Sequence, residues 1–231
     1  MGAHADADSS RTDIQLIANG PLRYLLLIPT GAAPAQGWPL LCFLHGYDEA
    51  APLDIHDALT RHGPLWPGSD VQARKKFIVI APQLPTKGDI WHRFADDVLS
   101  LVTQVRMQYG GDPQRCYLSG FSFGGNGVFD LAIVQPEAWA ALWAVDPPRV
   151  PRHDILCPVW LSVGEAARHR QESFVRALDL KPAEAGELET RLYLDQGEDH
   201  VGSARRAYVD ERIYRWLLTQ RLPEPPGPGT E

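Results

Sequence analysis

The sequence has no long apolar run and no strong excess of basic residues. No stretch approaches the roughly 20 apolar residues that a helix needs to cross a bilayer, so a membrane span is not expected. The formal net charge is −7, and basic residues gather only at Arg74-Lys75-Lys76 and Arg205-Arg206. Because nucleic-acid binding depends on basic surfaces that neutralise phosphates, this distribution argues against a nucleic-acid partner.

Cysteine is also scarce, with three residues at Cys42, Cys116 and Cys157. Each lies in or beside an apolar run that we expect to be a buried strand. The chain has neither a CxxC pair nor clustered Cys/His spacing, so no metal site is predicted. An odd number of buried thiols predicts reduced cysteines and a cytoplasmic location. The polar opening of the sequence lacks the apolar region of a signal peptide, which agrees with that expectation.

What the sequence does contain is a regular alternation of apolar runs and helical patterns over a length that suits one domain. The central apolar runs are nearly continuous, as in strands that are covered on both faces. We predict an α/β fold with a doubly wound, mostly parallel sheet and no large cap, over residues 14–222, between disordered tails at 1–13 and 223–231. The predicted strands cover residues 22–28, 39–44, 77–81, 115–119, 141–145, 158–163 and 190–194. The predicted helices cover residues 54–62, 94–109, 125–134, 171–178 and 204–220.

The most informative segment joins a predicted strand to a predicted helix through the pattern Gly120-x-Ser122-x-Gly124. Glycine on both sides of the serine is typical of a nucleophile elbow, in which side chains at the flanking positions would clash with neighbouring backbone. In such an elbow the backbone N–H of the next residue, Phe123, points at the oxygen of a bound carbonyl. We therefore interpret Ser122 as a candidate nucleophile.

A serine hydroxyl needs a base to take its proton, and the candidate is His200. It follows the last predicted strand and lies between Gly197 and Gly202 in a loop that precedes the final helix. The remaining histidines occur in the opening tail or in polar contexts that do not suggest a base. His45 also ends a strand, but a histidine before a glycine at that position is more often structural.

Two further loops follow predicted strands, at the edge where ligands bind in parallel sheets. The segment His45-Gly46-Tyr47 follows the second predicted strand, and the backbone N–H of Tyr47 is the candidate second donor to the oxyanion. The loop over residues 82–93 carries Trp91. Trp91 is a candidate wall of the substrate pocket, and packing of the loop against the domain is the equally open alternative.

With Ser122 and His200 in this order, the chain resembles the α/β-hydrolase superfamily between residues 22 and 222. Within it, the sequence is most similar to small esterases of the feruloyl-esterase, polyhydroxybutyrate-depolymerase and predicted-peptidase group. That resemblance implies Ser122 as nucleophile, His200 as base, and the amides of Tyr47 and Phe123 as the oxyanion hole. It rests on Leu44-His45-Gly46, Ala81-Pro82-Gln83, the run from Asp112 to Gly125, Pro158-Val159-Trp160-Leu161 and Gly197-Glu198-Asp199-His200.

The third member of the catalytic set departs from this group. Those esterases usually carry an aspartate in the loop after the strand at 158–163, where this chain has Ala167. The best replacement is Asp146, which ends the preceding strand and reaches the same edge of the sheet. Its segment Val145-Asp146-Pro147 is similar to the segment that carries the acid in pancreatic-type lipases. Glu165, in the usual loop, is the alternative acid.

Together these residues predict a serine hydrolase that cleaves a small-molecule carboxylic ester, or a thioester, through an acyl-enzyme. The chemistry requires no metal and no organic cofactor. One alternative is an acyltransferase or cyclase that acts on a biosynthetic intermediate with the same residues. The other is a degenerate hydrolase that acts as a binding protein, an alternative supported only by Ala167.

Overall fold

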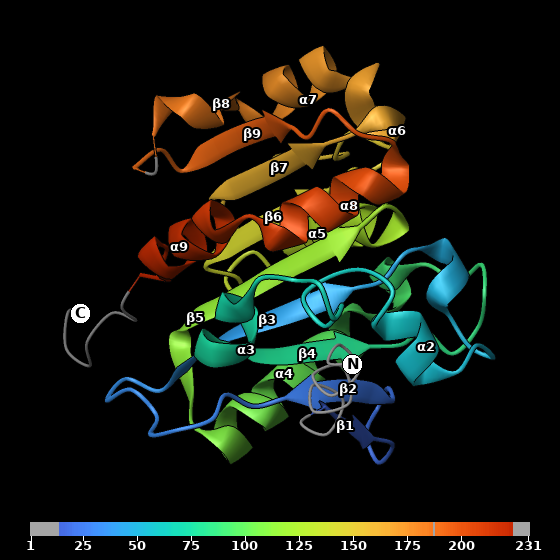
Figure 1. Cartoon of the computed structure of the whole chain (residues 1–231), viewed down its shortest axis with the longest axis vertical. Helices are drawn as coiled ribbons and strands as arrows, with labels where there is room; N and C mark the ends of the chain where they lie inside the picture. Colours follow the sequence, from blue (N-terminus) through green and yellow to red (C-terminus); the bar gives the residue numbers. More distant parts are fainter. Residues whose placement is uncertain (1–13, 187, 224–231) are drawn as a thin grey trace, which may run out of the picture.

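The computed structural model describes residues 14–186 and 188–223, which form one nine-stranded sheet with helices on both faces (Figure 1). The strand order is β1-β2-β4-β3-β5-β6-β7-β9-β8. β1 and β2 pair antiparallel, β2 is antiparallel to β4, and the remaining pairs are parallel. The strands are β1 (Ile14–Ile17), β2 (Tyr24–Leu27), β3 (Trp38–Leu44), β4 (Ile78–Pro82), β5 (Gly111–Phe121), β6 (Ala141–Val145), β7 (Val159–Val163), β8 (Lys181–Pro182) and β9 (Arg191–Asp195).

Both faces of the central strands are buried because their side chains point alternately into two apolar layers. Along β3, Leu40, Cys42 and Leu44 pack into one core cluster, whereas Leu41 and Phe43 pack into the other. This alternation is the two-residue period of a strand, and helices on both sides make both faces apolar. The three cysteines are free and buried, as the sequence predicts.

The helices divide between the two faces of the sheet. Figure 1 shows α8 and α9 crossing one face, with α5 on the other side of the strands. The helices are α2 (Ile55–Leu59), α3 (Val71–Lys76), α4 (Ala95–Tyr109), α5 (Phe123–Val134), α6 (Glu165–Arg168), α7 (Gln171–Leu178), α8 (His200–Val209) and α9 (Glu211–Thr219), with 3₁₀ turns η1 (Tyr47–Glu49), η2 (Trp91–Phe94) and η3 (Ala183–Ala185). Within the described part of the chain, no helix is long and apolar enough to cross a membrane.

The predicted fold class is confirmed, and the differences lie in short or interrupted elements. The strands β1 and β8 were not predicted, because they are short edge strands with exposed residues. The single final helix predicted over residues 204–220 is wrong. The chain turns extended at Asp210, whose carboxylate accepts a hydrogen bond from the amide of Arg212 and so starts α9 as a separate helix. Of the predicted tails at 1–13 and 223–231, residues 1–13 and 224–231 lie outside the described residues.

The direction in which successive strands are added to the sheet reverses at β3, which has β4 on one side and β5 on the other. In an open α/β sheet such a switch leaves a crevice at the carboxyl ends of the two diverging strands. The loop after β3 and the turn after β5 border this crevice. They carry Tyr47 and Ser122, respectively.

Candidate active site

Ser122 lies in a strained turn between β5 and α5. Its backbone has φ 55° and ψ −118°, a region that residues with a side chain rarely adopt. Close backbone contacts surround the turn: a Cβ on Gly124 would lie 1.9 Å from the carbonyl oxygen of Leu44, and a Cβ on Gly120 would lie 2.3 Å from the carbonyl oxygen of Gly124. The glycines are therefore required by packing, and the turn raises Ser122 above the end of the sheet.

His200 reaches the serine from the other side of the crevice. Its Nε2 lies 2.8 Å from Ser122 Oγ, a hydrogen-bonding distance. His200 is the first residue of α8, which begins four residues before the helix that we predicted over residues 204–220. Asp199 caps this helix by accepting a hydrogen bond from the amide of Gly202. The ring of Phe121 packs against the imidazole, with centroids 4.7 Å apart, so both the helix start and the aromatic contact fix the position of His200.

Asp146 is the carboxylate that contacts His200. Its Oδ2 lies 2.5 Å from His200 Nδ1, and the side chain is fully buried. It accepts hydrogen bonds from three backbone amides, those of Gly164 at 2.9 Å, Ala166 at 3.2 Å and Ala167 at 3.0 Å. By accepting a hydrogen bond from Nδ1–H, the Asp146 carboxylate fixes the tautomer of the imidazole and leaves Nε2 free to accept from Ser122.

The loop after β7 donates backbone hydrogen bonds to the Asp146 carboxylate. Ala167, where similar esterases place their acid, is buried and donates its amide to Asp146. Glu165, the alternative acid of the sequence, is exposed at the start of α6. The geometry thus brings Asp146, and not Glu165, to His200.

The two candidate oxyanion donors reach Ser122 from different parts of the chain, Phe123 as the next residue and Tyr47 from the loop after β3. Phe123 is the first residue of α5, and Tyr47 is the first residue of η1. Their rings meet edge to face with centroids 5.8 Å apart. A Cβ on Gly46 would lie 3.6 Å from Ser122 Cβ, so the backbone before Tyr47 passes directly beside the serine.

His45 holds the loop that carries Tyr47. Its Nδ1 donates to the carbonyl oxygen of Gly46 at 2.6 Å, and its Nε2 accepts from the amide of Leu84 at 3.0 Å. Burial lowers the pKa of His45 to about 4, so the imidazole is neutral near pH 7 and can hold both bonds at once. This is a structural role for His45, as the sequence suggested.

Trp91 packs against His45 and so supports the same loop. Its side chain is 1% exposed, and its indole N–H donates to the carbonyl oxygen of His45 at 3.1 Å. A cleft of about 550 Å³ lies alongside, lined by Trp91, Phe123 and Ile133 among others. Packing thus accounts for most of the Trp91 surface, and only its margin borders the cleft.

Three residues near the site were not singled out from the sequence. The ring of Phe121 contacts the imidazole of His62 as well as that of His200, with the His62 centroid 4.9 Å away. His62 Nε2 lies 3.9 Å from a carboxylate oxygen of Glu49. Burial raises the pKa of Glu49 and lowers that of His62 to about 4. Phe121 occupies a variable position of the Gly-x-Ser-x-Gly pattern, and nothing in the local sequence around His62 or Glu49 marks their proximity.

The described residues include no candidate metal site. Over residues 14–186 and 188–223, no three side chains of His, Cys, Asp or Glu are grouped so that they could hold one. The arrangement around Ser122 instead has the parts of an acyl-transfer site: a hydroxyl, an imidazole beside it, a buried carboxylate behind the imidazole, and backbone amides nearby.

Comparison with known proteins supports the fold and gives no sequence family. No family model matches the chain, and no curated protein matches it at a significant level. Among solved structures, a thermostable esterase superposes with a TM-score of 0.68 at 21% identity over 92% of this chain. The chain spans 64% of that esterase's length.

In two further solved structures the superposition spans most of both chains. The feruloyl esterase module from Clostridium thermocellum has a TM-score of 0.61 at 12% identity, over 87% of this chain and 88% of that one. The protein XC6422 from Xanthomonas campestris, described as an α/β serine hydrolase without a lid, has a TM-score of 0.58 at 16% identity, over 93% and 98% of the two chains. At these identities the likeness shows the fold, which is that of the α/β hydrolases.

Proposed function

We propose that this chain, which has the α/β-hydrolase fold, is a serine hydrolase that cleaves carboxylic esters or thioesters through an acyl-enzyme. The observation that carries the proposal is the continuous hydrogen-bonded line from Ser122 Oγ through His200 to the buried carboxylate of Asp146. Each group has the partner that its role requires, because a nucleophile needs a base and the base needs a group that fixes its tautomer.

In the acylation step, Ser122 Oγ attacks the carbonyl carbon while its proton passes to His200 Nε2. The carbonyl oxygen becomes an oxyanion, which the amides of Tyr47 and Phe123 are placed to bind. When the tetrahedral intermediate collapses, the bond to the leaving oxygen or sulfur breaks and the imidazolium donates its proton to that atom. A water molecule then repeats the sequence on the acyl-enzyme, with His200 as base, and releases the acid and free Ser122.

Asp146 acts on this cycle through the imidazole. The buried carboxylate accepts the hydrogen bond from Nδ1–H, which keeps the Nδ1 proton in place and stabilises the imidazolium that forms at each step. Three amide donors hold the charge of Asp146 in a position closed to water, so the carboxylate does not need solvent for its stabilisation.

Two observations support hydrolysis by this site. The proposed nucleophile lies at the end of the sheet, and the elements of residues 14–186 and 188–223 include no added cap over it, so water has access for deacylation. The amide that Ala167 donates to Asp146 counts against the binding-protein alternative, because that alternative was supported only by the missing acid at Ala167. The cytoplasmic location that goes with this proposal is supported by the three free, buried thiols.

The test is labelling with a fluorophosphonate, which reacts only with an activated serine, together with hydrolysis of p-nitrophenyl acetate and butyrate. We expect wild-type protein to be labelled and to turn over both esters, and Ser122→Ala to lose both activities while keeping its circular dichroism spectrum. Ser119→Ala is the matched control, because Ser119 lies three residues earlier and its hydroxyl is buried against Tyr208. A wild-type protein that resists labelling would contradict the proposal. Product analysis with an added alcohol acceptor would reveal transfer in place of hydrolysis.

A further inference from the structure

A second cleft, of about 430 Å³, lies beside the candidate active site between the segment after α2 and helix α8. The described residues that line it include Arg61, His62, Arg74 and Arg205 and no aspartate or glutamate. The chain as a whole carries a net charge of −7, so a cleft with only basic ionisable residues departs from the general surface. The arginines of this lining concentrate positive potential and favour an anion.

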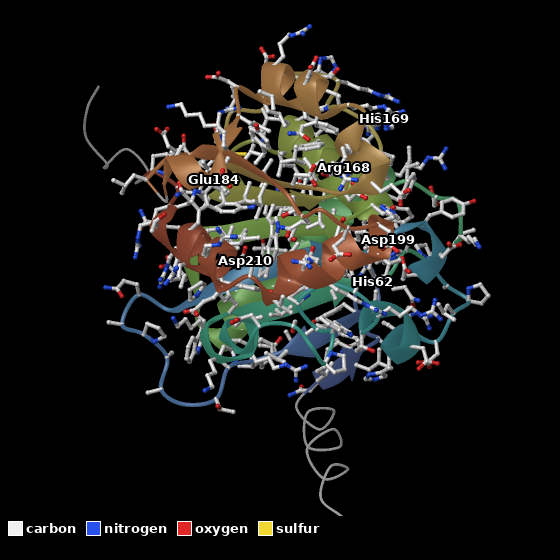
Figure 2. The ribbon with its side chains drawn as sticks, turned by 45° about the horizontal axis from the view of Figure 1, so that its top comes forward. His62, Arg168, His169, Glu184, Asp199 and Asp210 are labelled. Atoms are coloured by element: carbon white, nitrogen blue, oxygen red, sulfur yellow. The ribbon has the colours of Figure 1, made fainter. Side chains whose placement is uncertain are left out.

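This cleft is joined to the catalytic residues by one aromatic ring. His62 lines the cleft and contacts Phe121, whose ring also contacts His200. Helix α8 makes a second connection, because it begins with His200 and carries Arg205 a turn and a half later. Figure 2 shows His62 close to the start of α8, where Asp199 is labelled. The cleft therefore begins one aromatic ring away from the base.

The basic side chains are partly pre-organised. The Arg205 guanidinium lies over the ring of Trp66, 5.9 Å from its centroid, a cation–π contact that limits its rotation and leaves its N–H edge available. Among the described residues, His62 Nδ1 is buried and has no hydrogen-bond partner. The Glu49 carboxylate lies 3.9 Å from His62 Nε2 and attracts Arg61 electrostatically, but it does not line the cleft.

The chemistry of the proposed reaction decides which part of a substrate would enter this cleft. His200 must hand its proton to the leaving oxygen or sulfur, so the leaving group lies on the His200 side of the carbonyl. The cleft adjoins His200 through Phe121. A group several bonds beyond the leaving atom would thus reach Arg61 and Arg205.

We propose that the cleft lined by Arg61, His62 and Arg205 binds an anionic group, a carboxylate or a phosphate, on the leaving alcohol or thiol of the substrate. The inference rests on the proposed function, since it assigns a substrate class to the same site. Bidentate donation from a guanidinium suits both kinds of anion, and binding energy from this remote group lowers the barrier when it positions the carbonyl at Ser122.

Matched substrates test this directly. Two pairs of acetyl thioesters are compared. In the first pair, the thioester of 3-mercaptopropionate carries a carboxylate and its methyl ester is neutral. In the second pair, the thioester of 2-mercaptoethyl phosphate carries a phosphate and that of 2-mercaptoethanol is neutral. We expect kcat/KM to be about tenfold higher for at least one anionic member at low salt, and the preference to shrink as ionic strength rises. The pair that shows the preference identifies carboxylate or phosphate as the preferred anion.

Variants then locate the preference. Arg61→Gln and Arg205→Gln should each reduce the ratio of anionic to neutral kcat/KM several-fold, and together bring it close to one. The control is Arg206→Gln, the next residue on α8, whose guanidinium pairs with Glu198 and does not line the cleft. It should leave the ratio unchanged. Equal loss of the ratio in all three variants, or none in Arg61→Gln and Arg205→Gln, would overturn the proposal.

A binding measurement separates this inference from the proposed activity. The positive charges of Arg205 and Arg61 add to burial in lowering the pKa of His62, so an anion in the cleft should raise that pKa. Following the His62 imidazole by NMR while adding inorganic phosphate or propionate to Ser122→Ala protein reports binding without turnover. A protein that is labelled by fluorophosphonate but shows neither this shift nor the substrate preference keeps the proposed function and loses the anion cleft.

Discussion

His200 Nδ1 and the Asp146 carboxylate meet at 2.5 Å although 54 residues separate them in the chain. Asp146 leaves the end of β6 with a positive φ of 44°, and its amide donates to the carbonyl oxygen of Ser162 in the neighbouring strand. The carboxylate is thus directed across the end of β7 towards the loop that carries His200. An acid placed one strand earlier than in similar esterases still reaches the same imidazole nitrogen.

The first prediction tests the identity of the acid. Asp146→Asn should lower kcat on p-nitrophenyl acetate by a factor on the order of 10⁴, because an amide fixes the wrong imidazole tautomer and cannot stabilise the imidazolium. Glu165→Gln, which alters an exposed carboxylate in the loop after β7, should keep kcat within about threefold. Steady-state kinetics of both purified variants checks this. If Asp146→Asn stays within about threefold of wild type, the assignment of Asp146 fails.

A second prediction concerns a carboxylate at the position that similar esterases use. Ala167→Asp should lower the free energy of unfolding at pH 7 by about 2–4 kcal/mol, because it buries a second negative group beside Asp146. Ala166→Asp, at a half-buried neighbour whose amide also donates to Asp146, should cost less. Urea unfolding of the two variants measures the difference. Increased activity and unchanged stability of Ala167→Asp would show that an acid at this position can serve His200.

The elbow offers a third prediction from two adjacent glycines. A methyl group at Gly124 would lie 1.9 Å from the carbonyl oxygen of Leu44, whereas one at Gly125 would lie 3.1 Å from the side chain of Pro147 and 3.3 Å from the carbonyl oxygen of Val145. The first contact requires the backbone to move and the second only a shift of a few tenths of an ångström, so Gly124→Ala should cost more than about 3 kcal/mol and Gly125→Ala about 1 kcal/mol. Chemical denaturation and fluorophosphonate labelling together check the ranking. Comparable stability of the two variants would contradict the close approach of the β3 loop to the elbow.

The fourth prediction is a loss of stability in acid that arises from two buried histidines. The pKa values of His45 and His62 are lowered to about 4, mainly by burial, against about 6.5 in an unfolded chain. Between those pH values the unfolded state binds more protons than the folded state, so the free energy of unfolding falls as the pH decreases from about 6.5 to about 4. Above pH 6.5 both histidines are neutral in both states, and none of this stability is lost. At pH 5 each histidine should account for about 2 kcal/mol of the loss.

Urea unfolding at pH 7 and pH 5 measures this linkage. His62→Gln removes one of the two titrating groups and should make the drop between the two pH values smaller by about 2 kcal/mol. A variant with the same drop as wild type would show that His62 does not titrate in this way. His45→Gln is less suited to the test, because it also breaks the hydrogen bonds to Gly46 and Leu84.

Much of the fold could be predicted because the signals are local. The apolar run at residues 141–145 became β6 with the predicted bounds, and the predicted helix over 171–178 is α7. One final helix was predicted where the structure has two, α8 and α9. The break at Asp210, which caps α9, leaves no trace in the sequence pattern because the apolar period runs through both helices. Short edge strands such as β1 have too few buried residues to give a periodic pattern.

The sequence by itself determined the strand–turn–helix around Ser122 and the late position of His200, because glycine spacing and apolar period are properties of neighbouring residues. Only the tertiary structure decided between Asp146 and Glu165, brought Phe121 between His62 and His200, and gathered Arg61 and Arg205 around one cleft. The reason is range: a hydrogen bond or ring contact acts over a few ångströms, and strand order decides which of several distant residues come that close.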